Sequence, residues 1–97
     1  MDTREYYVYI MTNPVHTVLY TGMTSDLVQR VHQHRSKTVE SFTKRYNIVQ
    51  LVYYETWATA YDAITREKQI KAGSRQKKID LVYRMNPGWV DLYDSLT

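Results

Sequence analysis

The sequence predicts a small α+β fold in which helices flank a three-stranded antiparallel sheet. Three short segments are dense in aromatic and β-branched residues and are bounded by turn-forming residues. Three further segments carry apolar residues at helical spacing. The chain has 97 residues, of which 43% are hydrophobic, so it can bury one core. We therefore expect residues 1–97 to form a single domain.

The first two strands are predicted to pair as a hairpin. Residues 6–11 (Tyr-Tyr-Val-Tyr-Ile-Met) predict a buried strand. The segment 12–14 (Thr-Asn-Pro) favours a turn, because the residue before a proline is kept out of the helical region. A second strand is predicted over 18–21, and the short connection makes the pair antiparallel. Gly22 is expected to end this strand, where another group can approach the backbone closely.

The middle of the chain predicts a helix, a polar connection and a third strand. The helix is predicted over 26–36, with an N-cap from the segment 24–26 (Thr-Ser-Asp). Residues 37–47 are polar and mixed, which predicts a loop or a short turn. The third strand is predicted over 48–56, where valine, leucine and tyrosine dominate.

Two more helices are predicted in the last third of the chain. Thr59 begins the first of them, and the pair Ala-Gly at 72–73 closes it. Ser74 is expected to cap the next helix, which stops at the Asn-Pro-Gly segment 86–88. Apolar residues in the segment 89–93 predict a short terminal turn that docks on the rest of the domain.

The composition excludes several classes of protein. Cysteine is absent, which rules out disulfides, thiolate metal sites and a cysteine nucleophile. The longest apolar run is far too short to span a bilayer, and residues 1–5 lead into no signal-type stretch. No serine triad motif and no phosphate-binding glycine loop is present. We therefore expect a soluble cytoplasmic protein with no membrane partner.

Positive charge is concentrated in one stretch of a chain whose formal net charge is +3. Between residues 66 and 78 a single carboxylate, Glu67, stands against six cations. The cations are Arg66, Lys68, Lys71, Arg75, Lys77 and Lys78. Such a stretch raises the local concentration of polyanions such as nucleic acid. A solvated helix face is the alternative interpretation, and a charge run alone favours it.

Two short motifs at the predicted hairpin resemble the signature of the GIY-YIG endonuclease family. They are Val-Tyr at 8–9 and, after ten intervening residues, Tyr-Thr-Gly at 20–22. The segments 66–71 (Arg-Glu-Lys-Gln-Ile-Lys) and 86–89 (Asn-Pro-Gly-Trp) resemble the small stand-alone bacterial proteins of this family. The resemblance covers nearly the whole chain and implies a GIY-YIG nuclease-like α+β fold.

This resemblance implies hydrolysis of phosphodiester bonds by five side chains. The residues at the matching catalytic positions are Tyr9, Tyr20, Arg30, His34 and Glu67. Arg30 offers a planar, permanently charged fork for phosphate oxygens. Glu67 is implied as the metal ligand for one Mg²⁺, with Mn²⁺ as the alternative. One carboxylate suffices because Mg²⁺ keeps several of its waters.

The other implied residues surround the attacking water. Tyr20 would accept the proton of this water if neighbours lowered its pKa, which is ordinarily about 10. Tyr9 would position water or phosphate, and His34, one turn after the arginine, would be an auxiliary base or phosphate contact. Gly22 and Asn86 are expected to support the site. We expect the implied residues to converge on one concave surface.

The sequence departs from the family pattern at three positions. Tyr7 stands where the first motif has its leading glycine, and Thr21 stands where an aliphatic residue is usual. Met23 stands where many members carry a lysine, which puts the activation of the attacking water in question. Glu67 also has a second interpretation, as the partner of Lys71 in an i,i+4 helix pair.

The predicted function is a Mg²⁺-dependent endonuclease that cuts DNA, with branched or flap structures in repair or recombination as expected substrates. RNA is the alternative substrate, and a protein partner could supply specificity. The residues expected to bind DNA are Lys68, Lys71, Arg75, Lys77 and Lys78. A rival hypothesis is a nucleic-acid-binding module on the same fold with weak or no cleavage, which Met23 favours. A third is a protein–protein adaptor that uses exposed tyrosine and tryptophan side chains.

Overall fold

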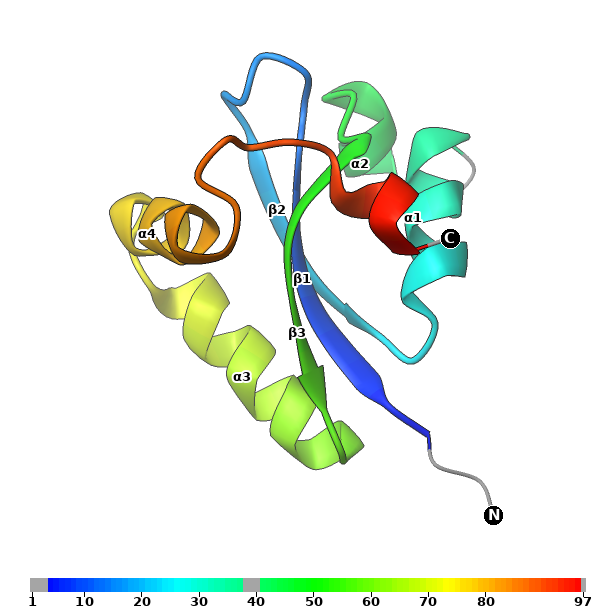
Figure 1. Ribbon diagram of the computed structural model, residues 1–97, viewed down its shortest axis with the longest axis vertical. Helices are drawn as coiled ribbons and strands as arrows, with labels where there is room; N and C mark the ends of the chain where they lie inside the picture. Colours follow the sequence, from blue (N-terminus) through cyan, green and yellow to red (C-terminus); the bar gives the residue numbers. More distant parts are fainter. Residues whose placement is uncertain (1–3, 38–40, 97) are drawn as a thin grey trace.

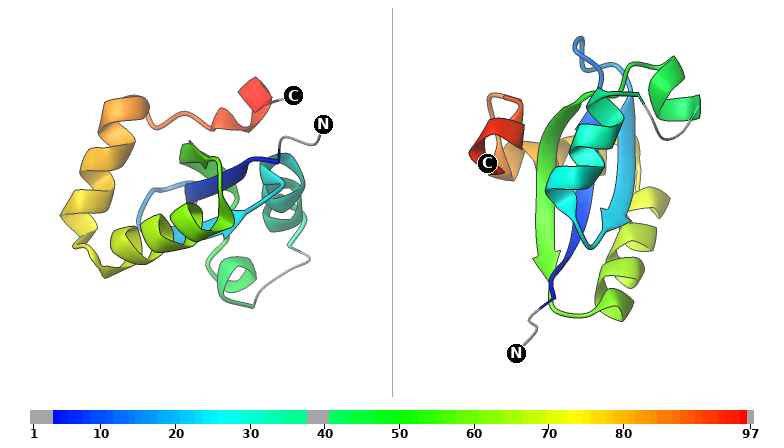
Figure 2. Two further views of the ribbon diagram at one scale, coloured as in Figure 1. Left: turned by 90° about the horizontal axis from the view of Figure 1, so that it is seen from below. Right: turned by 90° about the vertical axis from the view of Figure 1, so that its right-hand side faces the viewer.

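The computed structural model describes residues 4–37 and 41–96 and shows a three-stranded antiparallel sheet between helices, as predicted (Figure 1). The elements are β1 (Tyr6–Thr12), β2 (Leu19–Thr24), α1 (Leu27–Arg35), α2 (Ser41–Arg45), β3 (Gln50–Trp57), α3 (Ala60–Ala72), α4 (Arg75–Met85) and the 3₁₀ helix η1 (Leu92–Leu96). Helices α3 and α4 lie on one side of the sheet, and α1 and η1 lie on the other (Figures 1 and 2). The short helix α2 lies beside the edge strand β2 (Figure 2).

Strand β1 is the central strand of the sheet, in the order β2-β1-β3. Tyr9 pairs with Gly22 of β2 on one side and with Tyr54 of β3 on the other. Side chains of a strand alternate between the two faces, and both faces of β1 are covered. From Val8 to Met11 the strand is apolar at every position, because neither face meets water there.

The two faces of the sheet carry two hydrophobic cores. The face toward α3 and α4 is built by Val8, Ile10, Val52, Tyr53, Ala63, Ile70 and Val82. The face toward α1 and η1 is built by Tyr9, Met11, Leu27, Val31, Ile48 and Leu51. The alternation within β1 thus assigns its even-numbered residues to one core and its odd-numbered residues to the other.

Two local predictions were wrong. Strand β2 does not end at Gly22 but continues to Thr24, because the pairing with β1 runs on to Tyr7. The polar segment 37–47 contains a helix of five residues, α2, which is too short to show helical periodicity in its sequence. Residues 38–40 of that segment lie outside the described residues.

The predicted helix starts and the turn between α3 and α4 are confirmed by their hydrogen bonds. Asp26, Thr59 and Ser74 each accept from a backbone N–H three residues ahead, as N-caps do. At the turn, the Lys78 ammonium donates to the carbonyl of Gly73 at 2.6 Å, where α3 leaves its last carbonyls without helical partners. Lys78 therefore helps to hold α4 against the end of α3. Within the described residues, no helix is long and apolar enough to cross a membrane.

Candidate active site

Tyr9 and Gly22 face each other across the hairpin and fit closely together. They are paired in the β1–β2 ladder, so their side-chain positions lie on the same face of the sheet, the one toward α1. A Cβ added to Gly22 would lie 2.4 Å from the hydroxyl oxygen of Tyr9. The glycine thus leaves the space that the tyrosine ring occupies. The expected close approach at Gly22 is confirmed, and the approaching group is Tyr9.

His34 of α1 lies behind this tyrosine. The hydroxyl of Tyr9 is 3.2 Å from Nε2 of His34, and both residues are buried, at 0% and 1% exposure. Their rings meet edge to face, with centroids 5.9 Å apart. Burial keeps both side chains below the surface, so they form a supporting layer rather than one that meets solvent.

Tyr20 lies above this layer and is half-buried. Its ring centroid is 6.3 Å from that of Tyr9 and 5.3 Å from that of His34. On its other side it lies 6.2 Å from the ring of Phe42 in α2. Tyr9, Tyr20 and His34 therefore form one aromatic cluster, which we call the tyrosine–histidine cluster.

Phe42 is a residue near the site that the sequence reasoning missed. It lies in the segment that was predicted as a loop, and its ring also packs on Tyr46 with centroids 4.8 Å apart. The spacing of these two aromatic residues is i,i+4, which is the signal that could have indicated one turn of helix here.

Arg30 lies on α1, one turn before His34, and is half-buried. Its guanidinium forms no ion pair with any residue of the described ranges 4–37 and 41–96. Two other arginines form ion pairs: Arg35 lies 3.7 Å from Asp91, and Arg66 lies 2.9 Å from Glu55. Arg30 is therefore a cation one helical turn from His34 of the tyrosine–histidine cluster, and no described carboxylate pairs with it.

Glu67 lies on α3, and so on the other side of the sheet from α1. Its carboxylate is 3.4 Å from the ammonium of Lys71, which is the i,i+4 pair considered above as an alternative. Arg30 and Glu67 thus belong to helices on opposite faces. The expectation that all five predicted residues converge on one face is therefore not met, because the helix of Glu67 lies across the sheet from the helix of Arg30 and His34. A surface that joins Glu67 to Tyr20 would have to run round the edge strand β2.

The neighbouring Arg66 fixes how α3 is turned about its axis. Its Nε donates to both oxygens of Glu55 on β3, at 3.0 and 3.1 Å. On a helix of 3.6 residues per turn, Arg66 and Glu67 flank the buried Ala63–Ile70 stripe on opposite sides. Because Arg66 points toward β3, Glu67 points toward β2.

Glu55 is the centre of a half-buried polar group between β3 and α3. Tyr53 and the indole N–H of Trp57 also donate to its carboxylate. Burial alone would raise the pKa of Glu55, but the hydrogen bonds from Arg66, Tyr53 and Trp57 outweigh it and hold the pKa below its usual value. Burial, together with the hydrogen bond to Glu55, raises the pKa of Tyr53. This group therefore locks the helix that carries Glu67.

A pocket of about 320 Å³ opens beside Tyr20 at the β2 edge. Its walls are Leu19, Tyr20, Thr21, Phe42, Lys71 and Lys78. Tyr20 and Phe42 come from the α1 side of the sheet, whereas Lys71 comes from α3. The pocket therefore connects the two faces. The buried hydroxyl of Thr21 has no hydrogen-bond partner among the described residues.

The basic residues expected to bind DNA do not form one uniform surface. Lys71 pairs with Glu67, and Lys78 is held by backbone carbonyls. Arg75 makes a 3.5 Å contact with the carbonyl of His16 in the β1–β2 loop. Lys68 and Lys77 are exposed, and within the described part of the chain they form no ion pair.

Asn86 lies at the end of α4, where its side chain joins two other segments. Its amide nitrogen donates to the carbonyls of Val52 on β3, at 3.1 Å, and Val90, at 2.8 Å. Its amide oxygen accepts from the backbone N–H of Val90. These contacts join the end of α4 to β3 and to the segment that follows, so Asn86 fixes the chain after α4.

Comparisons with known proteins agree on one family. A model of the GIY-YIG catalytic domain matches residues 5–80. The chain is 42% identical over 64 residues to a UPF0213 protein of Staphylococcus saprophyticus, covering 66% of this chain and 78% of that protein. It is 38% identical over 76 residues to a UPF0213 protein of Haloquadratum walsbyi, covering 78% and 84% of the two chains.

A solved structure is similar over nearly the same length. The solution NMR structure of a UPF0213 protein from Bacillus halodurans superposes with a TM-score of 0.57 at 28% identity, covering 90% of this chain and 92% of that one. The matched residues 5–80 include the tyrosine–histidine cluster, Arg30 and Glu67. The chain therefore belongs to the GIY-YIG family, a nuclease superfamily whose members generally use a divalent metal.

Proposed function

We propose that this protein is a Mg²⁺-dependent endonuclease that hydrolyses phosphodiester bonds of DNA. The observation that carries the proposal is the tyrosine–histidine cluster, in which a half-exposed Tyr20 is held over a buried Tyr9–His34 pair. The guanidinium of Arg30, one turn before His34 and without an ion pair among the described residues, adds the cation that a phosphodiester attracts.

Arg30 neutralises charge on the phosphate in this proposal. The phosphodiester gains negative charge on its equatorial oxygens as water attacks. A guanidinium already in place stabilises that charge without reorganisation. Arg30 lies one turn before His34 on α1, and in this proposal its fork binds the phosphate that the water attacks.

Tyr20 takes the proton of the attacking water, and the buried pair holds Tyr20 in position. His34 packs against the Tyr20 ring, and its Nε2 is fixed by the Tyr9 hydroxyl. Tyr9 and His34 are therefore positioning residues, because both are buried, whereas Tyr20 and Arg30 reach solvent.

Glu67 is the residue that would hold the metal ion. Within residues 4–37 and 41–96, no three histidine, aspartate or glutamate side chains gather into a metal-binding group. A single carboxylate fits Mg²⁺, which retains most of its waters and binds through one or two carboxylates. When bound there, the ion would supply Lewis-acid stabilisation of the phosphate and of the leaving oxygen. The Lys71 ammonium shares this carboxylate, so it would be displaced or would itself contact phosphate.

A second function, a nucleic-acid-binding module without strong cleavage, is favoured by Met23. Met23 pairs with Val8 and packs against the core on the α3 side. The side chain at this position therefore contributes packing and no positive charge beside the motif.

One experiment separates the two functions. Purified protein is incubated with linear, flap and four-way DNA, and with single-stranded RNA, in Mg²⁺, in Mn²⁺ and with a chelator. Arg30→Ala should lower cleavage by roughly 10²-fold, the size of a lost transition-state charge contact. The matched control is Arg35→Ala, which removes the same charge from the same helix at a residue paired with Asp91. Binding without cleavage by the wild type in either metal would select the binding module.

A further inference from the structure

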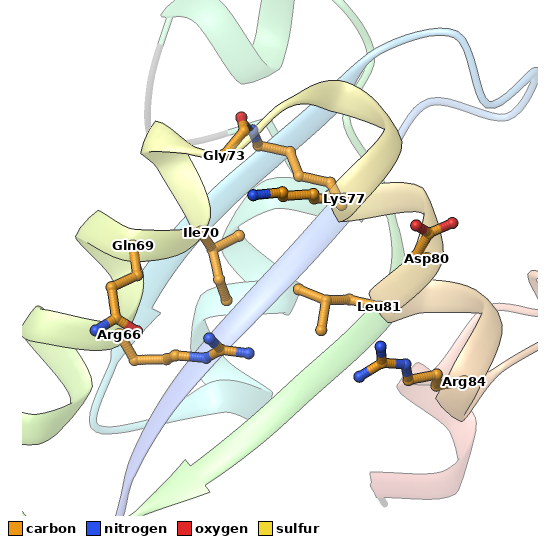
Figure 3. A pocket seen from close by; sticks show the side chains of 9 residues that line it. Arg66, Gln69, Ile70, Gly73, Lys77, Asp80, Leu81 and Arg84 are labelled. Atoms are coloured by element: carbon orange, nitrogen blue, oxygen red, sulfur yellow. Dashed lines mark hydrogen bonds between the residues drawn. The ribbon is translucent and has the colours of Figure 1, made fainter.

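A second pocket, of about 340 Å³, lies in the angle between α3 and α4 (Figure 3). The two helices diverge from the turn that contains Gly73. The wall residues used below are Arg66 and Ile70 of α3 and Lys77, Asp80, Leu81 and Arg84 of α4. On each helix these residues recur at helical spacing, so they form the stripe that faces the other helix.

Cations occupy positions that facing helices usually fill with apolar side chains. In Figure 3 the guanidinium groups of Arg66 and Arg84 point toward one another, and Lys77 extends along the α3 side of the pocket. Arg66 is balanced by Glu55, but Lys77 and Arg84 form no ion pair with any described residue. Asp80 is the one carboxylate that the described part of the chain contributes to the walls. The pocket therefore gathers more positive charge than the one described carboxylate in its walls, Asp80, and the Glu55 partner of Arg66 can neutralise.

We propose that this pocket binds a nucleoside phosphate. Cations that face one another repel, and an anion between them adds two attractions that outweigh this repulsion. An arginine fork and a lysine ammonium are the side chains that proteins use for phosphate groups. Ile70 and Leu81, between the cations, offer an apolar wall for a sugar and base (Figure 3). The pocket volume lies within the range of about 300–1,000 Å³ that holds small ligands.

The choice of a nucleotide rather than another phosphate ester rests on the proposed nuclease function. Lys78 lines both this pocket and the one beside Tyr20, so the two pockets are neighbours. A nucleic-acid strand with one nucleotide between α3 and α4 would continue past Lys78 toward Tyr20. The same chemistry also suits a free mononucleotide, so both a mononucleotide and an oligonucleotide are tested.

The test is an NMR titration of ¹⁵N-labelled full-length protein with adenosine monophosphate and, separately, with a short thymidine oligonucleotide. We expect saturable shifts at the amides of Gly73, Lys77 and Leu81. The double variant Lys77→Gln with Arg84→Gln should bind about tenfold more weakly or worse, since each side chain supplies a charge-assisted hydrogen bond. Both residues are exposed, so the fold should survive, and the amide spectrum checks this. The matched control, Arg4→Gln with Lys37→Gln, removes one arginine and one lysine that are exposed and line neither pocket.

A gain in affinity provides an independent check. Asp80→Asn removes the negative charge from the wall and should tighten binding about two- to fivefold, the size of a surface charge pair. Saturation by the mononucleotide supports a free ligand. Saturation by the oligonucleotide alone, lost in the double variant, supports a bound strand. If neither ligand shifts these amides, or if the double variant binds like its control, the proposal is wrong. Because no cleavage is measured, this outcome is separate from a failure of the nuclease function.

Discussion

The hydroxyl of Tyr9 lies 3.2 Å from Nε2 of His34, and both side chains are buried. This contact joins the central strand to α1, from residues that are 25 positions apart. A polar contact in the core favours one arrangement of the two elements that it joins, because any shift would leave a buried hydroxyl or imidazole without a partner, which is costly. The pair therefore fixes where α1 sits on the sheet, and with it the position of Arg30.

Tyr9→Phe tests the structural importance of this pair. The variant keeps the ring and removes the hydroxyl, so we expect the free energy of unfolding to fall by about 1–3 kcal/mol. Urea unfolding followed by circular dichroism measures the change. Tyr61→Phe is the control, because Tyr61 is 78% exposed. Equal stability of Tyr9→Phe and its control would show that the hydrogen bond adds nothing.

Tyr20→Phe tests the proton-accepting role. Removal of the phenol oxygen should lower the rate of DNA cleavage by roughly 10²-fold or more, the usual contribution of a general base. DNA binding should remain close to that of the wild type, because the ring and its packing on His34 are kept. Single-turnover cleavage and fluorescence anisotropy measure the two quantities. A fully active Tyr20→Phe protein would remove Tyr20 from the mechanism.

Glu67→Ala tests the metal-binding role. The variant should lose Mg²⁺-dependent cleavage but bind DNA as well as the wild type or better, because it removes a negative charge and frees Lys71 from its ion pair. Asp62→Ala is the control, since it removes the same charge from the first turn of the same helix. Cleavage that survives in Glu67→Ala and still requires Mg²⁺ would place the metal elsewhere.

Glu55→Gln tests the polar group that locks α3. Because the pKa of Glu55 is lowered in the folded protein, the ionised carboxylate stabilises the fold at pH values above its ordinary pKa of about 4.5. This stabilisation is lost as the pH falls through the lower pKa of the folded state. The variant should thus be less stable than the wild type at pH 7, by about 1.5–3 kcal/mol. Thermal unfolding should show that this difference in stability between variant and wild type becomes smaller toward pH 3. A stability difference that does not change with pH would show that the ionised carboxylate is not its cause.

Gly22→Ala tests the fit between the two motif strands. The added Cβ would lie 2.4 Å from the Tyr9 hydroxyl oxygen, so the tyrosine or the strand must shift, at a cost of about 1–3 kcal/mol. Gly88→Ala is the control, because a Cβ there meets only Val90, at 3.7 Å. Comparable urea midpoints for the two variants would show that the hairpin accommodates the methyl group easily.

Most of the fold could be predicted from the sequence, because its signals are local. The strand at 6–11 was visible from its run of β-formers, and the caps at Asp26, Thr59 and Ser74 from their residue types. The continuation of β2 beyond Gly22 was not visible, because pairing with β1 decides where that strand ends. Helix α2 was missed because five residues are too few for a periodic pattern.

The candidate site was predictable only in part. The motif residues indicated Tyr9 and Tyr20, but no spacing rule shows that Tyr9 would be fully buried while Tyr20 reaches solvent. The charge run did not reveal that Lys78 bonds to the carbonyl of Gly73. Nor did it show that Arg66 forms an ion pair with Glu55 on β3. These partners are distant in the sequence or depend on how α3 and α4 are turned, so only the three-dimensional structure identifies them.

The close fit of Tyr9 over Gly22 sets a rule for exchanging parts between relatives of this protein. A chimaera that takes β1 from one parent and β2 from another would bring together a ring and a backbone that were never matched. A bulkier residue at position 22 could be accepted only with a smaller one at position 9. The hairpin should therefore be transplanted whole, as a single cassette from one parent.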